Sequence, residues 1–95
     1  MNIDAALLMI DMCCEHRHAL CIKNTRKLLL VGIGQVADVC IAAIQTSEQP
    51  EKWAHSRREI QLVKNLAEEG LASDRLERAF FQIQGVSLRA VPSPI

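Results

Sequence analysis

The chain has 95 residues, of which 49% are hydrophobic but only three are aromatic, and its eleven basic and eleven acidic side chains cancel. This length predicts one domain, and a core of aliphatic and sulfur-containing side chains favours packed helices over a β-sandwich. Zero net charge argues against a basic surface for nucleic acid or an anionic membrane, and it favours association with other proteins.

The first predicted helix covers residues 5–14, which are good helix formers. Asn2 or Asp4 can cap its N-terminus. The helix is apolar around almost its whole circumference, so we expect one face to meet the core and another to meet a partner. Glu15 to His18 break the pattern and predict a turn.

A helical hairpin is predicted at the centre of the chain, over residues 16–43. Apolar residues at helical spacing form one stripe that includes Leu28, and a second stripe covers residues 36–44. Gly32 and Gly34 lie between the two stripes. Because glycine readily adopts the conformations that end a helix, we predict a tight turn there.

Two further helices are predicted in the second half of the chain. Pro50 suits the first turn of a helix that continues to Glu69, and Gly70 is expected to end it. Ser73 can then cap the last helix, which Gly85 ends. The residues expected to face the core in these helices are Trp53, Ile60, Val63, Leu66, Ala67, Leu76, Phe80 and Ile83.

These elements predict an all-α protein of stacked helical hairpins with about five helices. Residues 1–85 are expected to form a single helical-hairpin domain. Residues 86–95 contain two prolines and no helical period, which predicts a flexible C-terminal tail. The rival interpretation is an α/β fold in which residues 28–33 or 36–44 form a buried strand, because short apolar runs do not distinguish the two.

The N-terminal sequence carries no sign of a secretion signal. Asp4 and Asp11 interrupt the first apolar run, and no charged segment precedes it. We also expect no membrane-spanning helix, because no window approaches the roughly 20 apolar residues that one requires. The prediction is a cytoplasmic protein whose four cysteines stay reduced.

A cluster of cysteines and histidines could bind a metal ion. Structural zinc sites usually place two pairs of ligands across a folded loop, and here one cluster occurs without a second pair. In the alternative interpretation the cysteines are small core residues and the histidines lie in a turn. We predict no metal and no cofactor. The clustered residues are Cys13, Cys14, His16, His18 and Cys21.

Other candidate sites for chemistry are incomplete. A histidine near Cys14 can lower a thiol pKa, but no Asn or Asp has a defined orienting role. The Gly-Ile-Gly at residues 32–34 lacks the strand and third glycine of a dinucleotide-binding loop. Arg57, Arg58 and Lys64 share their helix with four glutamates, which indicates a solvated face with ion pairs. We predict that the protein is not an enzyme.

The N-terminal helix has more flexible apolar side chains than a chain of this length is expected to cover. Methionine and leucine at helical spacing can line a groove for another amphipathic helix, and they can equally be core. Trp53, the sole tryptophan, is either a core anchor or an interface hot spot. The candidate partner-binding residues are Leu7, Leu8, Met9, Met12, Val36, Cys40 and Trp53.

Several motifs occur in an order typical of one protein family. A short helix at residues 7–12 leads to a His-x-His pair, an amphipathic helix, a glycine turn and a helix that opens with small apolar residues. In these features the chain resembles the tetratricopeptide-like co-chaperones that hold the needle subunit of bacterial type III secretion systems. The matching residues are His16, His18, Leu28, Gly32, Val36, Ala37, Glu51, Trp53, Arg75 and Leu76.

The resemblance implies a curved, TPR-like stack whose concave face grips the amphipathic C-terminal helix of a needle subunit. Covering that helix in the cytoplasm prevents the subunit from polymerising before export. The resemblance also implies a second small helical chaperone in a heteromeric complex. We therefore predict a virulence-related chaperone that binds proteins and neither nucleic acid nor a membrane.

The C-terminal half supports an alternative. Residues 57–85 are similar to the end of the iron–sulfur delta subunit of methyl-viologen-reducing hydrogenases. This resemblance implies a small redox subunit of an iron–sulfur hydrogenase or heterodisulfide-reductase-type complex. That family's Gly-Cys and Asp-Cys-His segments have no counterpart here, and Cys40 alone cannot hold a cluster.

Overall fold

The computed structural model describes residues 3–15 and 23–90, and these residues form helices and turns without a strand. The all-α prediction is confirmed, and the α/β alternative for residues 28–44 is wrong. The elements are α1 (Ile3–Glu15), α2 (Lys23–Gln45), the 3₁₀ helix η2 (Pro50–Trp53), α3 (Ala54–Ser73) and α4 (Leu76–Ala90).

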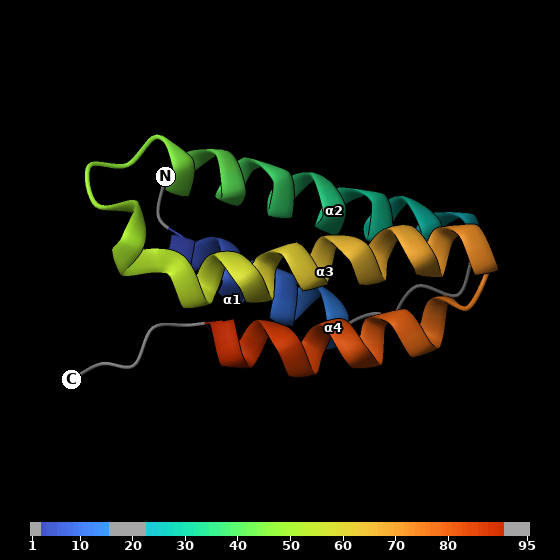
Figure 1. Cartoon of the computed structure of the whole chain (residues 1–95). Coiled ribbons are helices and arrows are strands. Elements are labelled where there is room, and N and C mark those ends of the chain that lie inside the picture. Colours follow the sequence, from blue (N-terminus) through green and yellow to red (C-terminus); the bar gives the residue numbers. More distant parts are fainter. Residues whose placement is uncertain (1–2, 16–22, 91–95) are drawn as a thin grey trace.

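Successive helices run in opposite directions and form a bundle (Figure 1). α2 packs on α3, α3 packs on α4, and α1 lies behind them with α4 as its main neighbour. The contact between α1 and α2 is far smaller than the other three seams of the bundle. The order around the bundle is therefore α2, α3, α4, α1, with an incomplete closure between the first and the last.

The core is aliphatic, with one phenylalanine at its centre. Full burial of a large apolar side chain contributes about 1.5–3 kcal/mol, so these residues supply most of the stabilisation. The core-facing stripes expected in the second half of the chain are confirmed for α3 and α4. The buried apolar residues are Ala6, Leu7, Ile10, Cys14, Leu30, Ile33, Ala37, Cys40, Ile44, Ile60, Val63, Ala67, Leu76, Ala79, Phe80, Ile83 and Val86.

The predicted glycine turn in the middle of the chain is wrong. α2 continues through Gly32 and Gly34, and neither residue has a positive φ. A helical glycine costs about 1 kcal/mol relative to alanine. Leu30, Ile33 and Ala37 keep one helical stripe across both glycines and are buried, so their burial outweighs that cost. The hairpin over residues 16–43 is thus mostly one helix, and the described residues hold four α-helices instead of five.

The junction of α3 and α4 also differs from the prediction. Gly70 lies inside α3, which continues to Ser73, and the next residue, Asp74, takes the left-handed conformation with φ 60°. The backbone N–H of Arg75 donates to the Gly70 carbonyl at 3.2 Å, which closes the helix end. Ser73 therefore ends α3 and does not cap α4; its hydroxyl donates to the Glu69 carbonyl at 2.8 Å.

Helix boundaries elsewhere in the chain match the prediction only in part. α4 continues through Gly85 to Ala90, and Val86 is buried, so the predicted tail is wrong for residues 86–90. Pro50 does occupy the first turn of a helix, the 3₁₀ helix η2, as expected. The turn predicted from Glu15 to His18 is wrong for Glu15, which is the last residue of α1. The rest of that turn, the expected cap at Asn2 and the tail at residues 91–95 lie outside the described residues.

The expectation that no segment resembles a membrane helix needs correction. Residues Asn24–Gln45 of α2 are long and apolar enough to cross a membrane, by length and composition alone. Core helices of soluble proteins have the same property, and α2 packs along α3. Only 28% of the most apolar part of this segment is buried, so α2 presents apolar side chains on its surface as well.

Candidate functional site

The incomplete seam between α1 and α2 forms an apolar groove. It has a volume of about 230 Å³, and no charged side chain lines it. The groove exists because α1 is held by α4 and approaches α2 only loosely. Its lining residues are Met9, Ile10, Cys13, Leu28, Leu29, Gly32, Ile33 and Val36.

Exposed apolar side chains extend this groove over the outer surface of α1. Leu8, Met9 and Met12 are 59%, 51% and 50% exposed, and Leu28 on α2 is 71% exposed. Contiguous apolar surface of this kind typically marks a contact with another protein. Methionine and leucine side chains are flexible, and they can adapt to a helix laid against them.

The structure divides the predicted partner-binding residues into three groups. Leu8, Met9 and Met12 are exposed on α1, and Val36 lines the groove half-buried. These four therefore share one surface region.

Leu7 and Cys40 are 1% and 0% exposed. They belong to the core, so a partner cannot touch them while the bundle is intact.

Trp53 lies at the other end of α2, in the η2 turn. Its side chain is half-buried against the core, and the Lys52 ammonium lies 5.9 Å from the centre of its ring. The side chain therefore packs against the core at the α2–α3 connection. Trp53 is not part of the α1–α2 groove.

Sequence reasoning missed part of the groove. Leu28 belongs to a predicted apolar stripe and Gly32 to a predicted turn, yet both line the groove on one continuous helix. The helical phase of the apolar residues in α2 could have indicated that Leu28 lies at the surface. Residues spaced three and four apart from Leu30 to Ile44 define the core face of α2, and Leu28 lies outside that phase.

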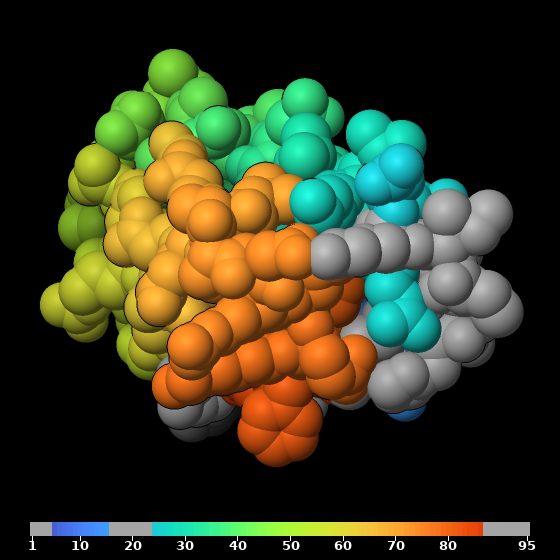
Figure 2. Space-filling view, turned by 90° about the vertical axis from the view of Figure 1, so that its right-hand side faces the viewer, coloured from blue at the N-terminus to red at the C-terminus, as the bar shows by residue number. Residues whose placement is uncertain are grey.

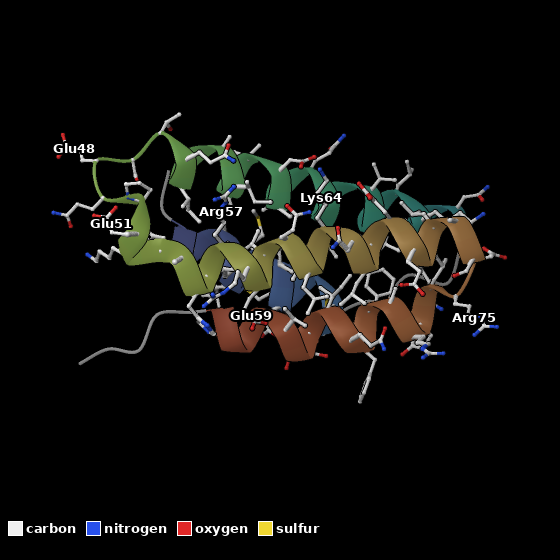
Figure 3. The ribbon with its side chains drawn as sticks, viewed as in Figure 1. Glu48, Glu51, Arg57, Glu59, Lys64 and Arg75 are labelled. Carbon is white, nitrogen blue, oxygen red and sulfur yellow. The ribbon has the colours of Figure 1, made fainter. Side chains whose placement is uncertain are left out.

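Charged side chains connect α2 and α3 at two places. The Lys64 ammonium lies 2.6 Å from an Asp38 carboxylate oxygen across the α2–α3 seam, where Figure 3 shows Lys64 between the two helices. The hydrogen bond and negative charge of Asp38 raise the pKa of Lys64. Lys27 pairs with Asp74 at 3.4 Å, between the start of α2 and the end of α3. These pairs orient α2 on α3, and the groove on the other side of α2 stays apolar.

Helix α1 is held less firmly than the others. It is the shortest of the described α-helices, with 13 residues, and it has little contact with α2. One Asp11 oxygen is buried and has no hydrogen-bond partner in the described part of the chain, which opposes burial of α1.

The described residues do not assemble a metal site. Among them, no group of three or more His, Cys, Asp or Glu side chains could hold an ion. Cys14 and Cys40 are buried free thiols, and Cys13 is a half-buried free thiol in the groove. The other members of the predicted cluster, His16, His18 and Cys21, lie outside the described residues.

Thiol reactivity offers a direct test of this arrangement. Burial raises the pKa of the Cys40 thiol, which lowers its thiolate fraction at any pH below that value. We expect iodoacetamide to label Cys13 at least ~10²-fold faster than Cys40, since Cys40 reacts only after the bundle opens. Peptide mass spectrometry after timed labelling measures the two rates. The rates should converge in denaturant, and equal rates in native buffer would contradict the burial of Cys40.

No protein-family profile, no curated protein and no solved structure matches this chain.

Proposed function

We propose that this protein is a cytoplasmic co-chaperone that holds an amphipathic helix of a type III secretion needle subunit in the α1–α2 groove. Covering the apolar face of that helix blocks premature polymerisation of the subunit. The observation that carries the proposal is the uncharged groove at the one loose seam among the described helices, bordered by the exposed side chains of Leu8, Met9 and Met12.

A bound helix would complete the closure of the bundle. Helix-in-groove recognition uses apolar anchors at i, i+3, i+4 and i+7, and the groove offers an apolar wall on both sides. Burying the remaining half of a side chain such as Met9 contributes roughly 1 kcal/mol. Several such contacts must also overcome the entropy lost on association, so the helix should bind reversibly.

The groove is the proposed counterpart of the concave face of a TPR-like stack. A second small helical chaperone remains part of the proposal, as the partner that stabilises the heteromeric complex. The role needs neither catalysis nor a cofactor, because the lining side chains supply contact area and no acid–base pair.

The proposal is tested with a fluorescent peptide that carries the C-terminal amphipathic helix of a needle subunit. Gly32→Glu places a carboxylate in the groove, where an added Cβ meets nothing within 4 Å, so the variant should fold normally. We expect Gly32→Glu and Met9→Asp each to weaken binding at least ~10-fold, because an unpaired charge would be buried in the complex. Fluorescence anisotropy measures the affinity.

Arg58→Ala on the outer face of α3 is the matched control and should bind as the unmodified protein does. Bound peptide should also protect Cys13 from alkylation, since Cys13 lines the groove. Undiminished binding by Gly32→Glu would remove the groove from the proposal. A brown protein with visible absorbance would instead favour the alternative, a small iron–sulfur redox subunit.

A further inference from the structure

A second apolar hollow lies on another face of the bundle, between α3 and α4. Its volume is about 400 Å³, and it is lined by Leu62, Leu66, Phe81, Gln82, Gly85 and Val86. Phe81 is 71% exposed, so an aromatic side chain projects beside a hollow on the same patch. Figure 2 shows the surfaces of α3 and α4 side by side, with α4 projecting at the lower edge.

We propose that a second copy of this chain covers this face and forms a two-fold symmetric dimer. A two-fold interface brings the same patch of both copies together, so the patch must complement itself. A projecting Phe81 next to a hollow meets that requirement, because each copy can place its phenylalanine in the hollow of the other. Aromatic side chains that fill pockets in this way dominate interface energetics.

Gly85 supports the close approach of a second helix. It is an exposed residue inside α4, and an added Cβ would meet nothing within 4 Å. A glycine inside a helix costs about 1 kcal/mol relative to alanine, and no contact among the described residues requires it here. In a dimer, the missing side chain would let Phe81 of the second copy approach the backbone of α4.

The charge of the chain is compatible with self-association. Its eleven basic and eleven acidic side chains cancel, so net charge adds no repulsion between two copies.

The face is large enough for a weak but specific dimer. α3 has 20 residues and is about 30 Å long, and two adjacent helices present a width of about 20 Å. Each copy can thus bury about 600 Å², and the total of about 1,200 Å² lies at the lower limit of specific interfaces. The dimer would leave both α1–α2 grooves open, so this inference is independent of the proposed function.

Sedimentation velocity of the full chain over a range of concentrations tests the proposal. We expect the mass to rise with concentration from 10.6 kDa to twice that value. Phe81→Glu should shift dimerisation to at least ~10-fold higher concentration, because the carboxylate would enter the apolar hollow. Leu28→Glu on α2 is the matched control, since Leu28 is also 71% exposed, and it should dimerise as the unmodified chain does.

A chain that stays monomeric at all concentrations overturns the proposal. A dimer that is abolished by Leu28→Glu but unaffected by Phe81→Glu would also overturn it. That result would place the second copy in the α1–α2 groove. Growth beyond the dimer would also contradict a closed two-fold interface.

Discussion

Phe80→Ala should unfold much of the protein population, whereas Phe81→Ala should leave its stability almost unchanged. Phe80 is fully buried at the centre of the core, and its neighbour Phe81 projects from the surface. Truncation of a buried phenylalanine costs about 3–5 kcal/mol, which approaches the whole stability of many small domains. Truncation of an exposed one should cost less than about 0.5 kcal/mol.

Urea denaturation followed by circular dichroism measures both values. The experiment should use protein concentrations at which both variants are monomeric, so that dissociation of the proposed dimer does not contribute. Equal losses for the two variants would mean that α4 is rotated about its axis relative to the bundle described here.

Gly70→Ala should destabilise the protein by about 2 kcal/mol, even though alanine is the better helix former. A Cβ at this position would lie 2.5 Å from the Ala79 Cβ and 3.2 Å from a Leu30 methyl carbon. The contact between α3 and α4 would have to open to accept it, because the Ala79 Cβ is fixed to the backbone. Gly70 is therefore required by close packing inside α3 and not by the end of a helix.

Another glycine and a compensating double variant provide controls for this variant. Gly85→Ala meets nothing within 4 Å and should stabilise the monomer by up to about 1 kcal/mol. The double variant Gly70→Ala/Ala79→Gly should recover at least about 1 kcal/mol of the loss, which a double-mutant cycle measures. If Gly70→Ala were as stable as Gly85→Ala, the close approach of α3 and α4 would be wrong.

The helical character of the chain was predictable because apolar residues recur at helical spacing in every segment. The core stripes of α3 and α4 follow from that period alone, and so does the surplus of apolar side chains at Leu8, Met9 and Met12. The exposure of these three residues confirms that α1 is not enclosed by the rest of the described chain. Local pattern is sufficient here because one helix has one core-facing side.

Glycines misled the prediction, because a glycine permits the end of a helix without requiring it. Gly32, Gly70 and Gly85 all lie within helices, and only packing distinguishes their roles. Gly32 lines the α1–α2 groove, and Gly70 lies beside Ala79. Gly85 lies where we propose that a second copy of α4 packs. Ala79 and the α1 residues of the groove come from other helices, so the sequence around each glycine does not identify these neighbours.

By itself, the amino-acid sequence determined that this chain is helical, carries no net charge and has apolar side chains in excess on its first helix. Only the tertiary structure decided which of those side chains are core and which are surface, placing Leu7 inside and Leu8 outside. It also decided that the open seam lies between α1 and α2. The physical reason is that periodicity defines the faces of each helix, whereas the neighbour of each face is chosen by packing among all the helices at once.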